Sequence, residues 1–152
     1  MLHARPAKLK GRDMLRAWMT HLIVHIMELE MPLRTVVVAR DQTLVLGPVQ
    51  EPRQLLEQLF ALFLRGRLAP LPFMSETSYQ YALYACQGQP DRAVKEANVA
   101  WQGRYGSSGE GDDPYLVFRY QSGEEPLDQQ FREMAIRVFS PVLAHMMEDD
   151  NG

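Results

Sequence analysis

Two histidines with chelating spacing are the first residues that could do chemistry. His21 and His25 stand four residues apart, so a helix would place both rings on one face, where they could share a zinc ion. The residues between them are Leu, Ile and Val, so the general-base Glu of a metalloprotease helix is missing, and so is the third ligand. We therefore interpret the pair as packing residues that hydrogen-bond locally.

A glycine-rich, oxygen-rich loop offers a second set of ligands. Glu110, Asp112 and Asp113 follow Ser107 and Ser108 in this stretch. A Ca²⁺ loop would need alternate ligands closed by a distal bidentate Glu, which is absent. The loop also lacks the Lys-Ser/Thr ending of a P-loop and follows a predicted helix instead of opening one. A solvated, flexible connection is the preferred interpretation.

Nucleophilic catalysis and base stacking find little support. Cys86, the single cysteine, is predicted to be a small apolar residue on a helix face, and no serine occupies a Gly-x-Ser-x-Gly turn. Tyr79, Tyr81 and Tyr84 could form a stacking surface for nucleic acid. On a single helix they would fan around it, which favours partial burial.

The element that positions the histidines is a long amphipathic helix, predicted over residues 11–30, whose apolar residues recur at three- and four-residue steps. Two β-branched runs, 35–39 and 43–46, then predict a β-hairpin. A second helix is predicted from Pro52 to Arg65 with Gly66 as its C-cap. Its many Leu and Phe residues predict burial between layers.

The second half of the chain alternates helices and loops. A third helix is predicted to start after Ser75 or Thr77, either of which could cap it, and a fourth covers about 91–102. Residues 115–120 alternate weakly and predict a short strand. The last helix is predicted from Leu127 to about Met147, with Pro141 kinking or restarting it. This order predicts an α/β fold in which helices cover a small central sheet.

Length and composition fit one globular domain: 152 residues, 46% of them hydrophobic. We predict a lead-in or linker at 1–9, a single domain at 10–148 and a tail at 149–152. One cysteine excludes an internal disulfide framework, no secretory signal is visible, and the uncharged runs are too short to span a bilayer. A cytoplasmic location without membrane association is expected.

Charge is unevenly distributed although the net charge is only −3. Basic residues gather before the first helix and on its first turns, whereas acids dominate from Glu124 onward. Such a chain is expected to pack against charged partners more than to coat DNA. A solvated helix start, or a surface that meets an acidic subunit, explains the basic residues at least as well as DNA does. If the chain does contact the DNA backbone, the expected phosphate partners are Arg5, Lys8, Lys10, Arg12 and Arg16.

Several short motifs occur in an order that resembles a known family. They are Leu15-Arg16-Ala17-Trp18 with His21-Leu22, Pro70-Leu71-Pro72-Phe73, Ala100-Trp101-Gln102-Gly103, Gly109-Glu110 with Asp112, Asp113 and Tyr115, Phe118-Arg119, and Val138 to Leu143. From about Lys8 to Leu143 the chain resembles the C-terminal domain of RecC, the gamma subunit of exodeoxyribonuclease V.

The resemblance implies an inactivated PD-(D/E)xK nuclease fold. Active members carry an Asp and a (D/E)-x-Lys on neighbouring strands, which hold Mg²⁺ and position the attacking water. The three lysines here, Lys8, Lys10 and Lys95, are preceded two positions earlier by Pro, Lys and Ala. The predicted strand 43–46 carries neither acid nor lysine, and Asp41 stands alone in a turn. No catalytic residue and no metal ligand are therefore expected.

The implied role is non-catalytic. The domain would scaffold the subunits of the RecBCD helicase-nuclease and guide DNA strands during double-strand break repair by homologous recombination. Expected partners are RecB-like and RecD-like subunits and forked or single-stranded DNA. ATP and Mg²⁺ would be used by the partner subunits, and this domain would bind no cofactor.

Two alternatives belong to other functional classes. One is a protein–protein interaction module without DNA contact, which would use apolar surface on the Met-rich first helix or on the last helix. The other is a small Mg²⁺ nuclease whose site is built from Glu110, Asp112 and Asp113.

Overall fold

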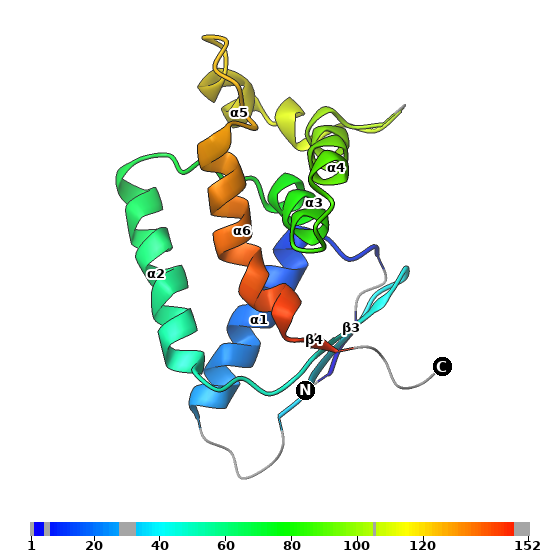
Figure 1. Cartoon of the computed structure of the whole chain (residues 1–152), viewed down its shortest axis with the longest axis vertical. Coiled ribbons are helices and arrows are strands. Elements are labelled where there is room, and N and C mark those ends of the chain that lie inside the picture. Colours follow the sequence, from blue (N-terminus) through cyan, green and yellow to red (C-terminus); the bar gives the residue numbers. More distant parts are fainter. Residues whose placement is uncertain (1, 5–6, 28–32, 105, 148–152) are drawn as a thin grey trace. The chain divides into compact units, whose positions relative to one another are not determined.

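A computed structural model describes residues 2–4, 7–27, 33–104 and 106–147. The chain divides into two compact units, one made of Met1–Leu71 with Pro141–Gly152 and the other of Pro72–Ser140 (Figure 1). It is an α/β protein, as predicted, and its small sheet belongs to the first unit. Among the described residues, no helix is long and apolar enough to cross a membrane.

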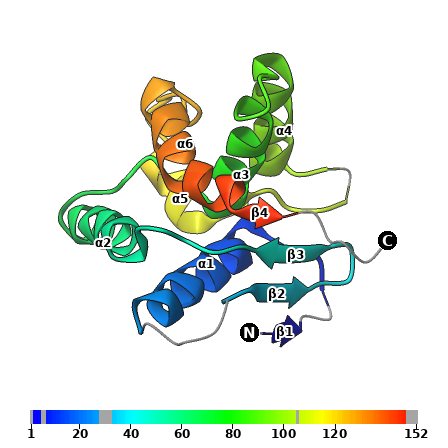
Figure 2. The same cartoon turned by 60° about the horizontal axis from the view of Figure 1, so that its bottom comes forward.

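The sheet has four short strands in the order β1-β2-β3-β4 (Figure 2). β1 (Leu2–Ala4) runs parallel to β2 (Thr35–Val38), and β2 pairs antiparallel with β3 (Thr43–Leu46). β4 (Met146–Met147) pairs antiparallel with β3 at the other edge. The β2–β3 hairpin confirms the sequence prediction, since valine-rich runs favour pleated strands. The two outer strands are too short to show any alternation in the sequence.

The end of the last helix differs from its prediction. α6 (Gln129–Ala144) stops before Met146, and the chain then joins the sheet instead of continuing as a helix to Met147. His145 O accepts a hydrogen bond from Gly47 N at 2.9 Å, which fixes this return. Gly47 fits here because a Cβ on it would lie 2.7 Å from Met147 Sδ. α6 also runs on through Pro141, so the predicted restart there does not occur.

α1 (Gly11–Ile26) is the main helix of the first unit and buries Met14, Ala17, Trp18 and Leu22. The start of α1 is stabilised by a hydrogen bond that Lys10 N donates to Asp13 Oδ2 at 3.1 Å. Met27 is the C-cap, and residues 28–30 of the predicted helix, with Pro32, lie outside the described residues.

α2 (Pro52–Leu68) contradicts the prediction of a buried helix. Pro52 occupies the first turn as predicted, but Gly66 lies inside the helix and Ala69 is the C-cap. Leu62 is the one buried residue of α2, while Phe60 is 58% exposed and Phe63 59%. The helix packs on α1 through a narrow face, so its apolar content exceeds what that contact covers.

The second unit is built on two packed helices, α3 (Ser75–Ala85) and α4 (Pro90–Gln102). Small residues allow their close approach, because Ala82, Ala93 and Ala97 are fully buried. The first part of α6 completes the unit, and Asp128 Oδ1 starts that helix by accepting from Phe131 N at 2.8 Å. The core of this unit consists of Met74, Ala97, Leu127, Phe131 and Ala135, with Tyr81, Trp101 and Leu116 packed against it.

A short helix replaces the strand predicted at 115–120. α5 (Pro114–Arg119) begins where Asp113 Oδ1 accepts from Tyr115 N at 2.9 Å. Pro114 presets the backbone of the first helical turn. An N-cap followed by proline is a stronger local signal than weak alternation, and it determines the structure here. The preceding loop also contains a 3₁₀ turn, η1 (Glu110–Asp112).

Candidate functional site

Four of the five predicted phosphate partners are exposed around the start of α1. Lys8 and Lys10 precede the helix, and Arg12 and Arg16 lie one turn apart on it. We call these four residues the basic patch. Arg5, the fifth predicted partner, lies outside the described residues.

The turn of the β-hairpin holds the segment that carries the basic patch. Leu9 N donates to Asp41 Oδ1 at 2.9 Å, and Arg40 N donates to Ala7 O at 3.2 Å. Asp41 therefore has a structural role, as the acceptor that holds this segment. The same contacts place the exposed Arg40 beside the segment containing Lys8. Sequence reasoning missed Arg40, because only this pairing across 32 residues brings it to the patch.

His21 is a buried structural link. Its Nε2 lies 2.8 Å from Gly47 O and its Nδ1 2.8 Å from Thr35 Oγ1. A carbonyl can only accept, so the neutral ring carries its proton on Nε2, and Nδ1 accepts from the threonine hydroxyl. Burial lowers the pKa of His21, which favours this neutral form. The ring thus ties α1 to the start of β2 and the end of β3.

His25 does not join His21 in a metal site. Its Nδ1 donates to His21 O at 2.9 Å within the same helix, and the two rings meet edge-on with centroids 4.2 Å apart. Trp18 packs against His21 and His145, with ring centroids 5.7 and 5.2 Å away. The prediction of packing residues that hydrogen-bond locally is confirmed for His25, whereas His21 hydrogen-bonds to residues 14 and 26 positions away in the sequence. In the part of the chain that the structure describes, no three His, Cys, Asp or Glu side chains are placed to hold a metal ion.

Glu110 caps α3 from a distant loop. Its carboxylate accepts from Ser75 Oγ at 3.1 Å, Glu76 N at 3.0 Å and Thr77 N at 2.7 Å. This arrangement satisfies free N–H groups at the N-terminus of the helix with a negative charge. The predicted caps are wrong, since Ser75 and Thr77 are helical residues that donate to Glu110. No local sequence signal identifies a cap 33 to 35 residues away.

The other loop acids are also engaged with backbone. Asp112 Oδ2 accepts from Gly109 N at 2.8 Å, and Asp113 caps α5. The loop is more than a flexible connection, because Gly111 packs so closely on Trp101 that a Cβ would lie 2.7 Å from the indole Cε2. Glu110, Asp112 and Asp113 therefore serve different backbone groups and do not converge on one ion.

The remaining candidates are Cys86 and the tyrosines of α3. Cys86 is the exposed C-cap of α3, so the prediction of a small apolar residue on a helix face does not hold. Desolvation raises the pKa of its thiol, which disfavours the nucleophilic thiolate. The tyrosines of α3 fan around the helix: Tyr79 is buried, Tyr81 packs on Phe131, and Arg92 lies over the ring of Tyr84.

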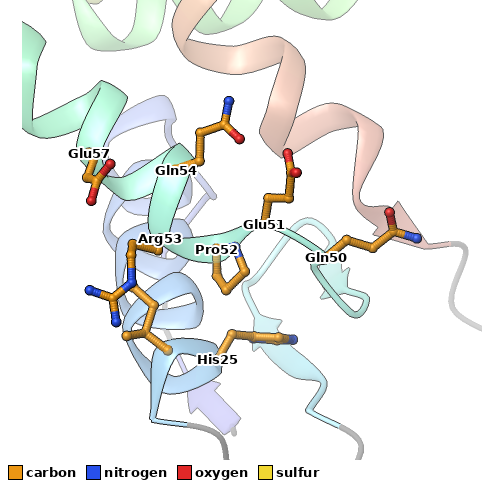
Figure 3. Close-up of a pocket in the computed structure, with 8 residues that line it drawn as sticks. His25, Gln50, Glu51, Pro52, Arg53, Gln54 and Glu57 are labelled. Carbon is orange, nitrogen blue, oxygen red and sulfur yellow. The ribbon is translucent and has the colours of Figure 1, made fainter.

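A pocket of about 380 Å³ opens between the end of α1 and the start of α2 (Figure 3). Its lining mixes the cation Arg53 with the carboxylates of Glu51 and Glu57. Figure 3 shows these side chains spreading apart and not converging with His25 on one point. The pocket therefore resembles a polar surface hollow more than a built active site.

The chain was compared with known protein families and with curated proteins. The family model of the RecC C-terminal domain matches residues 1–86, which cover β1 through α3 and more than half of the chain. No curated protein matches the chain. The matched segment contains the basic patch, His21 and the hairpin that His21 anchors. The chain therefore belongs to the RecC C-terminal domain family, and this membership implies a role as part of a RecBCD complex.

Proposed function

We infer that this chain is a non-catalytic, nuclease-like domain that scaffolds RecBCD subunits and guides DNA strands during double-strand break repair by homologous recombination. Its partners are RecB-like and RecD-like subunits, and forked or single-stranded DNA passes along its surface. The domain itself needs neither ATP nor Mg²⁺, which the partner subunits use.

The residue types and burial of β3 are the main support for the non-catalytic part of this proposal. In a PD-(D/E)xK nuclease this strand would present an acid to Mg²⁺ and a lysine to the attacking water. Here Leu44, Val45 and Leu46 are all buried, and the exposed residue of the strand is Thr43. The strand thus contributes to the core and offers no ligand. The engagement of Glu110 at the start of α3 supports the same conclusion.

The basic patch supports the DNA-guiding part. Its exposed cations, with Arg40 beside them, can contact phosphates without reading sequence. Arg12 and Arg16 repeat at the spacing of one helical turn, so both face the same side of α1. Arg5 extends the set by sequence alone.

The test is binding of the full chain to a forked duplex across a salt series, with Mg²⁺ present and the products separated on a gel. We expect salt-sensitive binding without cleavage. Replacing the four patch residues by Gln should reduce the slope of log K against log salt by up to about 3.6, at about 0.9 per lost phosphate contact. The matched control also removes four exposed cations and should leave the slope unchanged: Arg53, Arg65, Arg67 and Lys95 to Gln. Cleavage, or an unchanged slope in the patch variant, contradicts the proposal.

An interaction module without DNA contact is the second candidate function. It is favoured by Met19 and Ile23 on α1 and by its C-cap Met27, which repeat every four residues and are 41%, 48% and 64% exposed. Such a stripe suits contact with another protein. If the chain binds partner subunits but no forked DNA at low salt, this function replaces the DNA-guiding one.

A further inference from the structure

α2 carries a large apolar surface that its own unit leaves uncovered. Phe60, Phe63 and Leu64 stand at positions i, i+3 and i+4, and Leu68 follows one turn later. They are 58%, 59%, 44% and 89% exposed. We call these four residues the α2 patch. Isolated exposed apolar residues are ordinary, but four large ones clustered on a single helix indicate an interaction surface.

The chemistry of the patch fits a protein better than nucleic acid. The rings of Phe60 and Phe63 stack on each other, with centroids 6.2 Å apart and planes at 26°, so each ring already covers part of the other. Leu64 and Leu68 add aliphatic surface on which bases do not stack. Aromatic and leucine side chains side by side are typical of an amphipathic helix that lies against an apolar groove.

The charged residues next to the α2 patch indicate which charges a partner protein would carry around its own apolar contact surface. Arg65 and Arg67 are exposed in the last turn of α2, within the span of the patch. From Arg65 to Ser75 the chain contains no acidic residue that could neutralise them locally. Arginine is enriched in protein interfaces and pairs well with carboxylates. A matching surface therefore has an apolar centre with Asp or Glu side chains at one end.

We propose that the α2 patch is the docking face for one of the partner subunits of the complex, through an apolar surface edged by carboxylates. This inference rests on the scaffolding role given under Proposed function and names the surface that performs it. The patch and the basic patch lie on different helices, so one can be altered without the other.

The binding test uses the full chain with purified RecB-like and RecD-like subunits. Phe60→Ser with Phe63→Ser should weaken binding to one subunit by about tenfold or more, because exposed aromatic anchors dominate such contacts. Arg65→Glu with Arg67→Glu should also weaken it, and this loss should shrink at high salt. The matched control is Val117→Ser with Phe118→Ser, two exposed apolar residues on α5, which should bind normally. All six positions are exposed, so thermal unfolding should confirm that the variants fold.

A crosslink identifies the occupant directly. Since Cys86 is the only cysteine, Cys86→Ser with Leu64→Cys places a single photo-crosslinker in the patch. We expect a crosslinked subunit peptide that contains apolar residues and at least one Asp or Glu.

The outcomes separate this inference from the function on which it rests. If the wild-type chain binds the subunits and the Phe60/Phe63 variant binds equally well, the α2 patch is not the docking face, but the proposed scaffolding role is unaffected. If the wild-type chain binds neither subunit, both fail. Crosslinks to a second copy of the chain or to forked DNA added to the mixture also overturn the inference.

Discussion

Removing the Glu110 carboxylate tests whether the acidic loop serves structure or chemistry. In Glu110→Ala, Ser75 Oγ, Glu76 N and Thr77 N lose their shared acceptor. A hydrogen bond to a charged group contributes about 1.5–3 kcal/mol, and loss of a helix cap typically costs about 1 kcal/mol. Because Glu110 is only partly buried, water replaces some of these bonds, so we expect a loss of about 2–3 kcal/mol.

Urea unfolding followed by circular dichroism measures this loss. Glu110→Gln keeps an acceptor oxygen but loses the charge, and should cost about 1 kcal/mol because the charge also interacts with the helix dipole. Glu125→Ala, at an exposed position, is the matched control and should leave the free energy of unfolding unchanged.

The same measurement on Ser75→Ala distinguishes the two possible caps. If Ser75 were the N-cap that its sequence suggests, Ser75→Ala would cost about 1 kcal/mol and Glu110→Ala nothing. The structure predicts the opposite ranking, since Ser75 contributes one of three bonds to Glu110. A loss below about 0.5 kcal/mol for Glu110→Ala would refute the reasoning, because surface substitutions without a structural role fall within that range.

Three further results are expected from the packing of individual residues. His21→Ala should cost about 3–4 kcal/mol in urea unfolding, because it leaves Gly47 O and Thr35 Oγ1 without their partner. The wild-type chain should also lose stability as the pH falls below 6.5: the pKa of His21 is lowered in the fold, so the unfolded chain takes up a proton first. Above pH 6.5 His21 is neutral in both the folded and the unfolded chain, so it adds no pH dependence there. His21→Gln should remove the contribution of His21 to the loss of stability in acid. An unchanged profile of the free energy of unfolding against pH would contradict this. Gly111→Ala should lower stability by about 1–3 kcal/mol, because the new Cβ collides with Trp101, and a thermal melt equal to that of Ser108→Ala would contradict the close contact.

Local signals explain what could be predicted from the sequence. Amphipathic spacing gives α1, β-branched runs give the β2–β3 hairpin, and the alanine face of residues 91–102 gives α4. Each of these signals lies within one element. The family resemblance also depends on local motifs, and its first half falls within the matched residues.

The strand predicted at 115–120 failed because a stronger local signal, the N-cap Asp113 followed by Pro114, was overlooked. The other main errors arise where contacts between distant segments decide the structure. β1 and β4 exist because β2 and β3 offer edges for pairing, and no property of a two- or three-residue run reveals that. The cap of α3 comes from Glu110, more than 30 residues away. The exposure of α2 was missed because apolar content reports what a helix could bury and not what lies against it.

The polar residues that first suggested chemistry are therefore engaged inside the fold. His21 joins α1 to the hairpin, and Glu110 joins its loop to α3, so each would have to break structural bonds to bind a metal or a substrate. A group that a fold needs in one protonation state and one position is poorly placed to exchange protons or ligands during a reaction. The residues proposed to bind other molecules lie on the surface: they are the exposed cations around the start of α1 and the exposed apolar side chains on α2. This division of residues agrees with the proposed non-catalytic role, in which the chain acts through the surfaces that its partners contact.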